Sequence, residues 1–151
     1  QYIDHALNEI GDQFKLLLRA QCTSPFQRRE TISSAINLLI GNFETYDSVQ
    51  VVSSTKPNIA KSMTLDDENL FLQPAVSWGS ISPQNRQSLK SSYMRSNAFV
   101  VKTDRITADS VVGSRSGIVY SDELENIDID SPVDLRIAQL LANDDPSLLG
   151  L

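Results

Sequence analysis

The order of apolar and polar positions divides the first third of the chain into strand-like and helix-like segments. Residues 14–18 (FKLLL) form an apolar run with the length of a buried strand. Between Arg29 and Ile40 the apolar residues recur on one helical stripe, which Gly41 ends. Residues 47–54 (DSVQVVSS) are rich in β-branched side chains and predict a second strand. Residues 14–54 therefore predict a βαβ unit, right-handed and with parallel strands.

The segments on either side of this unit are less regular. Residues 1–10 predict an amphipathic helix with Gly11 as its C-terminal cap. Across residues 56–96 the pattern weakens into polar turns, and we expect this segment to leave the sheet as an excursion. Strand character returns in residues 97–103 (NAFVVKT), and residues 117–121 (GIVYS) predict a further short strand. The sequence has no internal repeats and no low-complexity tracts.

A final helix is predicted from its N-terminal signals. Ser131 suits the N-cap, Pro132 suits the first helical position, and Asp134 stands at the capping-box spacing from Ser131. We expect this helix to be largely buried because apolar residues follow its start. They are Val133, Leu135, Ile137, Ala138 and Leu141.

Two aspartates stand just before this helix, where Asp128 and Asp130 alternate with isoleucines in the stretch NIDID. Residues two apart in a strand share a face, so we predict that both carboxylates point the same way at a strand end. Ligands of open α/β sheets collect at the C-terminal ends of strands. Two such carboxylates repel each other unless a cation neutralises them, and Mg²⁺ takes one or two carboxylates together with substrate phosphates. A solvated strand end is the alternative interpretation.

Composition restricts the class of protein. The 151 residues, of which 40% are apolar, suffice for one domain with one core. A formal net charge of -6 argues against a duplex nucleic-acid surface, which needs clustered Lys and Arg. No apolar run approaches the roughly 20 residues of a membrane span, and no signal-peptide pattern is present. We therefore expect a soluble, cytoplasmic protein that binds neither nucleic acid nor membrane.

Two residues limit the possible catalytic schemes. Cys22 is the single cysteine and His5 the single histidine, so the chain forms no internal disulfide and no closed zinc site of such ligands. Ser-His-Asp and Cys-His catalysis needs a histidine beside the nucleophile. His5 lies in the predicted N-terminal helix, where a solvated histidine is expected. An EF-hand beginning at Asp128 is excluded, because Val133 and Gln139 occupy its glycine and glutamate positions.

Three segments resemble, in the same order, the acylneuraminate cytidylyltransferase family, which comprises the CMP-sialic acid synthetases and their relatives. LLRAQCTSPFQRRETISSAINLLI is similar to the family's strand, its Gln-Pro-Thr-Ser-Pro-Leu-Arg motif and the helix after it. NRQSLKSSYMRSNAFVV resembles its Arg-Gln segment followed by Tyr and an Asn-Gly strand. NIDIDSPVDLRIAQLL resembles its closing Asp-Ile-Asp-Thr-Pro-x-Asp-Leu and helix. Departures from the family pattern are Cys22 in place of Pro, Gln27 near an Arg position, and Ala98 in place of Gly.

The resemblance implies an α/β fold with a Rossmann-like three-layer nucleotide-sugar transferase sheet, usually in a homodimer to which the segment 56–96 contributes. The implied reaction transfers CMP from CTP to a sialic acid-type keto sugar acid and releases pyrophosphate. Asp128 and Asp130 would be the catalytic metal ligands and would hold Mg²⁺ against the triphosphate. The implied substrate-binding residues are Gln21, Thr23, Ser24, Arg86, Gln87 and Asn97.

One part of the family pattern is missing from this sequence. The family begins with a strand and a basic, glycine-containing phosphate-binding loop, and no such segment stands before Gln1. Residues 1–151 are thus expected to form a single cytidylyltransferase-like domain, truncated at the N-terminus and inactive alone. A non-catalytic binding or assembly module with the same fold is one alternative. A D-x-D nucleotide-sugar glycosyltransferase is another, although that motif usually lies in the middle of a domain.

Overall fold

The computed structural model describes most of the chain in two compact units. The described residues are 13–54, 93–107 and 109–149, together with Ile3, Glu9 and two short strands. The first unit comprises Gln1–Ser53 and Arg95–Leu151, and the second comprises Ser54–Met94. In the second unit, β3 (Met63–Leu65) and β4 (Leu72–Pro74) pair antiparallel. Most of the predicted excursion, and with it Arg86 and Gln87, lies outside the described residues, as does His5.

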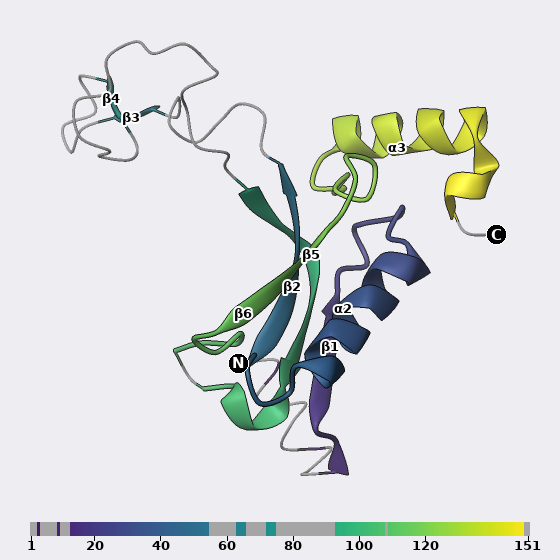
Figure 1. Cartoon of the computed structure of the whole chain (residues 1–151). Coiled ribbons are helices and arrows are strands. Elements are labelled where there is room, and N and C mark those ends of the chain that lie inside the picture. The colour runs from purple at the N-terminus through teal and green to yellow at the C-terminus, as the bar shows by residue number, and fades with distance from the viewer. Residues whose placement is uncertain are drawn as a thin grey trace. The chain divides into compact units, whose positions relative to one another are not determined.

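The first unit contains a four-stranded mixed sheet (Figure 1). Its strands are β1 (Leu16–Ala20), β2 (Ser48–Ser54), β5 (Tyr93–Lys102) and β6 (Ser116–Tyr120). They lie in the order β1-β5-β2-β6, with β1 antiparallel to β5 and β2 parallel to β6. All four segments were predicted as strands, with boundaries that differ by a few residues.

The strands β1 and β2 run in the same direction, but they are not neighbours. Lys102, at the end of β5, pairs with Leu16 at the start of β1, and its N–H donates to the carbonyl of Asp47 just before β2 (3.0 Å). Both strands therefore start beside the end of β5, which lies between them. The parallel direction predicted for residues 14–54 is confirmed. The insertion of β5 could not be predicted, because strand pairing depends on residues far apart in the sequence.

Apolar residues cover both faces of the sheet. The helix α2 (Arg29–Gly41) packs on one face through Ala35 and Leu39, against side chains that include Val100 of β5. On the opposite face, Phe99 and Val101 form a second cluster, which also contains Ile3. Successive residues of β5 thus enter different cores, as the two-residue period of a strand requires. None of the helices in the described ranges is long and apolar enough to cross a membrane.

The helix α3 (Pro132–Asp144) begins as predicted. The Ser131 hydroxyl accepts from the backbone N–H of Asp134 (3.3 Å) and donates to its carboxylate (2.6 Å). The hydroxyl is the largest cause of a lowered pKa at Asp134. The prediction of a largely buried helix is wrong, because only Ala138 is buried. The pattern of a helix indicates an apolar stripe but not whether another element covers it. The exposed apolar residues of α3 are Val133, Leu135, Ile137 and Leu140.

Candidate functional site

Two segments that contain predicted site residues, the loop after β1 and the strand β5, meet at the end of β1. The backbone N–H of Gln21 donates to the carbonyl of Asn97 (3.0 Å), which extends the β1–β5 pairing by one residue. The N–H of Ser24 donates to the carbonyl of Gln21 (3.3 Å) and so turns the chain. The side-chain amide of Asn97 donates to the hydroxyl of the buried Ser24 (2.5 Å). Gln21, Ser24 and Asn97 therefore belong to one hydrogen-bonded group, as a shared site requires.

The segment that contains the two aspartates joins this group. The backbone N–H of Ile129 donates to the carbonyl of Thr23 (2.9 Å). Asp128, next to Ile129, is half-buried, and its Oδ1 is a buried atom without a hydrogen-bond partner among the described residues. The same holds for the hydroxyl of Thr23. Two buried oxygens without partners in the described part of the chain thus lie on residues beside one short backbone contact.

The predicted strand for Asp128 and Asp130 is wrong. After β6 the N–H of Ser121 still donates to the carbonyl of Val52 (2.9 Å), but the carboxylate of Asp122 then accepts from the N–H groups of Leu124 and Glu125 (2.9 Å each). This side-chain turn ends the strand, because Asp offers the backbone a local hydrogen-bond partner. The aspartates lie in the irregular segment that follows. Asp130 is exposed, whereas Asp128 is half-buried.

Glu125 fixes this segment to α2 and was not predicted as a site residue. Its side chain is buried, and its two oxygens accept from the backbone N–H of Arg28 (3.1 Å) and from the hydroxyl of Thr31 (2.9 Å). Arg28 is the N-cap residue of α2 and makes no side-chain cap, and Glu125 satisfies the backbone N–H of this residue. The Arg28 guanidinium also pairs with Asp122 (2.8 Å). No local pattern reveals this contact, since the partners lie more than 90 residues apart.

A metal ion at this site would need ligands in addition to the carboxylates of the protein. The described residues contain no group of three or more His, Cys, Asp or Glu side chains suited to hold one. Asp128 and Asp130 together offer carboxylate oxygens, and the buried, unpartnered Oδ1 of Asp128 fits an oxygen ligand of a hard cation. Water and substrate phosphates would have to complete the coordination of Mg²⁺, which is its usual mode of binding.

A pocket of about 830 Å³ opens beside the first turn of α2. Gln27, Arg28 and Arg29 line it on the side of the loop after β1, and the side-chain nitrogen of Gln27 is buried without a partner in the described part of the chain. The lining contains two arginines and two acidic residues, so its charges balance. Its remaining lining residues are Glu30, Asp145, Ser147 and Leu148.

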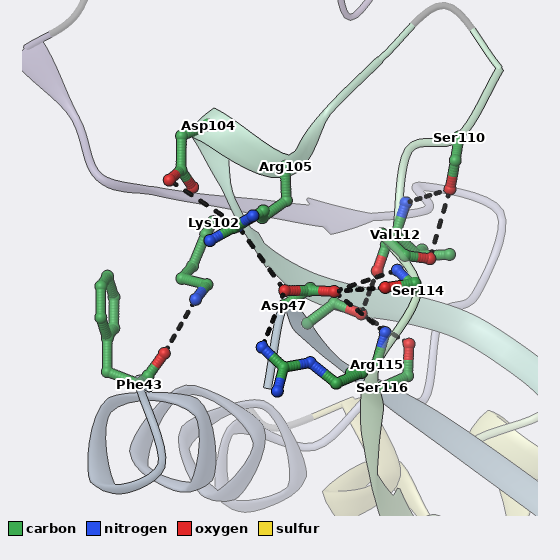
Figure 2. Close-up of polar contacts among 12 residues, drawn as sticks. Phe43, Asp47, Lys102, Asp104, Arg105, Ser110, Val112, Ser114, Arg115 and Ser116 are labelled. Atoms are coloured by element: carbon green, nitrogen blue, oxygen red, sulfur yellow. Dashed lines mark hydrogen bonds and ion pairs between the residues drawn. The ribbon is translucent and has the colours of Figure 1, made fainter. Parts of the chain in front are cut away.

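A second polar cluster, at the opposite end of the sheet, surrounds the buried Asp47 (Figure 2). One carboxylate oxygen accepts from the N–H of Ser114 (3.0 Å), the hydroxyl of Ser114 (3.1 Å) and the N–H of Arg115 (3.0 Å). The other oxygen faces the guanidinium groups of Arg105 (3.6 Å) and Arg115 (4.0 Å). The Arg115 N–H is the main reason that the pKa of Asp47 is lowered, against the opposing effect of burial.

The Asp47 cluster closes the loop before β6. Gly113 in this loop has a φ of +67°, which only glycine adopts readily. The hydroxyl of Ser48 donates to the carbonyl of Val112 (2.6 Å) and lies 2.7 Å from that of Ser116. Every donor of this carboxylate comes from the protein itself, so we assign the cluster a structural role.

These observations define an α/β protein with a four-stranded mixed sheet. No family model matches the sequence, and no curated protein matches it. The chain is similar in structure to the crystal structure of 4-diphosphocytidyl-2C-methyl-D-erythritolsynthase from Anaerococcus prevotii DSM 20548. The TM-score is 0.61 and the sequence identity 16%, and the match covers 93% of this chain and 64% of that chain. The likeness therefore concerns the fold, over about two thirds of the length of the solved protein.

Proposed function

We propose that the chain supplies the metal-binding and acceptor-binding half of a cytidylyltransferase site. The proposed reaction transfers CMP from CTP to a sialic acid-type keto sugar acid. A bond forms between a sugar hydroxyl oxygen and the α-phosphorus while the bond to pyrophosphate breaks. The sequence resemblance motivates the acceptor, and the fold shared with a synthase of a cytidyl diphosphate compound supports the cytidine nucleotide.

The contact between Ile129 and Thr23 carries this proposal. It joins the segment of the two aspartates to the loop after β1, and the Asn97–Ser24 bond joins that loop to β5. Three segments that are distant in the sequence, each part of the family resemblance, thus meet at one place. A ligand at this place would fall within reach of residues from all three.

Each residue has a defined part in the proposed site. The carboxylate of Asp128 would bind Mg²⁺ through its free Oδ1, and the exposed Asp130 would add a second ligand. When bound, Mg²⁺ supplies charge neutralisation at the phosphates. The hydroxyl of Thr23 has no partner among the residues that the structure describes, and Asn97 orients the hydroxyl of Ser24.

The acceptor side of the site depends on further residues. We propose that Gln21 contacts the sugar, and that Arg86, with Gln87 beside it, binds the acceptor's carboxylate, for which a planar guanidinium is suited. The match spans 64% of the similar structure, and we propose that nucleotide binding also needs a segment like the phosphate-binding strand and loop of the family that the sequence resembles. The 151-residue chain alone is then expected to bind metal and nucleotide weakly and to release no pyrophosphate.

Calorimetric titration with Mg²⁺ and CTP tests this proposal. The substitution Asp128→Asn keeps the shape of the side chain but removes its charge, and we expect it to weaken binding by about tenfold or more, as the loss of a charged ligand should. Asp104→Asn is the matched control, because Asp104 is exposed and lies at the end of the sheet where Asp47 is found. Its binding should equal that of the unchanged chain.

Two results would contradict the proposal. If Asp128→Asn binds Mg²⁺ and CTP as the unchanged chain does, a non-catalytic binding or assembly module becomes the better interpretation. If the isolated chain releases pyrophosphate from CTP with a sialic acid, the requirement for a further segment is wrong. A parallel assay uses 2C-methyl-D-erythritol 4-phosphate as the acceptor. It tests whether the acceptor is a sugar phosphate, as the compound named for the similar structure suggests, and not a sugar acid.

A further inference from the structure

The connection between β6 and α3 has to hold Asp128 in place without regular secondary structure. Residues 121–130 contain no helix or strand, and segments of this kind open more easily than the elements they join. The connection is nevertheless attached to the rest of the first unit by several specific contacts. Since a carboxylate ligand must be held within a fraction of an ångström, these contacts decide how well Asp128 can bind.

Glu125 links the connection to α2. It bonds to the backbone of Arg28 and to the hydroxyl of Thr31, at the start of α2. The helix is anchored in the core farther along, where Ala35 is 1% exposed and Leu39 is fully buried. A buried carboxylate with a donor on each oxygen resists displacement, because leaving either group unpaired is costly.

A local turn presents Glu125 to the helix. The carboxylate of Asp122 accepts from the N–H of Glu125 (2.9 Å), and the side-chain amide of Asn126 donates to the carbonyl of Asp122 (2.6 Å). Asn126 also accepts from the hydroxyl of Ser121 (3.2 Å). The Asp122–Arg28 ion pair adds a second link to the same end of α2. The turn and Glu125 thus act as one unit.

Two attachments then enclose the aspartate. Glu125 is bonded to Arg28, and Ile129 is bonded to Thr23. Along the chain, Asp128 lies between Glu125 and Ile129. With both attachments in place, its backbone is fixed on either side. Without Glu125, the hydrogen bond of Ile129 and the Asp122–Arg28 ion pair would be left to hold it.

We propose that Glu125 is a positioning residue, which holds the Asp128 segment against the loop after β1 by clamping it to the N-terminus of α2. It does not touch substrate itself. The clamp makes the two halves of the site one body, so that the free oxygens of Asp128 and Thr23 keep a fixed relation. Its consequence for metal and nucleotide binding rests on the proposed function, but the clamp itself does not.

Amide hydrogen exchange, followed by NMR on the 151-residue chain, tests the clamp without any ligand. In Glu125→Ala we expect the Ile129 amide to exchange about tenfold faster or more, because its bond to Thr23 loses the support of two hydrogen bonds to a carboxylate. The Val100 amide in β5 should be unaffected. The control Glu44→Ala removes an exposed carboxylate after α2 and should change neither amide.

A milder variant keeps the test valid if Glu125→Ala fails to fold. Thr31→Val removes the hydroxyl donor to Glu125 and preserves the shape of the side chain. It should raise the exchange of Ile129 by a smaller factor, again without change at Val100. An unchanged Ile129 amide in a folded Glu125→Ala, or in Thr31→Val, would overturn the proposal. Equal acceleration at Ile129 and Val100 would do so too, because it would indicate a merely global loss of stability.

Binding of Mn²⁺ with CTP gives the second measurement. Glu125→Ala should weaken it about tenfold at a temperature where the variant is fully folded, while Glu125→Gln, which keeps one acceptor oxygen, should lie between. Equal affinities in all three proteins would contradict the link between the clamp and the site. If the unchanged chain does not bind Mn²⁺ and CTP at all, the proposed function fails, and the exchange data still decide the role of Glu125.

Discussion

The contacts of Gly113 define how much free energy of unfolding is lost when a side chain is added there. A Cβ added to Gly113, whose φ is +67°, would lie 2.5 Å from the Cβ of Asp47. The left-handed conformation costs an L-residue about 1–2 kcal/mol. Overlap in a packed region typically costs a further ~1–3 kcal/mol. Gly113→Ala should therefore lower the free energy of unfolding by about 2–5 kcal/mol, against a total of ~5–15 kcal/mol for a typical domain.

The overlap cannot be relieved by a small movement of Asp47. Its carboxylate is held by Ser114 and Arg115, as Figure 2 shows, and its backbone is held as well. The N–H of Asp47 donates to the carbonyl of Arg115 (2.8 Å), and its carbonyl accepts from Lys102 (3.0 Å). Moving the side chain would break bonds to a buried carboxylate, and moving the loop would displace the start of β6.

Gly41→Ala is the matched control. Gly41 is the last residue of α2, and an added Cβ there meets no atom within 4 Å. Because alanine favours a helix over glycine, this change should be neutral or stabilise by up to about 1 kcal/mol. Urea unfolding, followed by circular dichroism, measures both variants from the midpoint at constant slope. If Gly113→Ala falls within about 0.5 kcal/mol of Gly41→Ala, the argument from the Asp47 contact is refuted.

Two further predictions concern polar groups. Because the pKa of Asp47 is lowered in the folded state, its carboxylate contributes stability fully above the ordinary value of 3.8, and this contribution is lost as the pH falls through the folded pKa. The difference in unfolding free energy between the unchanged chain and Asp47→Asn, measured from pH 2 to 7, should thus shrink below pH 3.8; a pH-independent difference would contradict this. Ser131→Ala should lower the free energy of unfolding by about 1 kcal/mol through loss of the α3 cap, whereas Ser33→Ala on the exposed face of α2 should have little effect. Equal effects at the two serines in urea unfolding would show that the cap does not stabilise the protein.

Local chemistry explains which elements could be predicted. The β-branched residues of β2 and the apolar stripe of α2 carry the periods of a strand and a helix in themselves. The cap of α3 was also predicted, because Ser131 and Asp134 are only three residues apart. The wrong strand for Asp128 has a local cause as well, since Asp122 forms a side-chain turn just before the alternation in NIDID.

The candidate site was predicted in part. The structure joins the loop of Thr23 and Ser24 to Asn97 and, through Ile129, to the segment of Asp128, and the site role of these residues stays a prediction. Glu125 was missed, since a glutamate in a polar stretch is ordinarily a surface residue. It becomes a clamp only because α2 begins beside it.

Local sequence patterns predict the four strands of the sheet, the helices α2 and α3, and the cap of α3, because each depends on residues within a few positions of one another. Only the folded chain shows that β5 lies between β1 and β2, that the apolar side chains of α3 stay exposed, and that Glu125 bonds the Asp128 segment to α2. These features depend on contacts between distant parts of the chain. Their free energies come from burial and desolvation at the point of contact, which no periodicity in the sequence records.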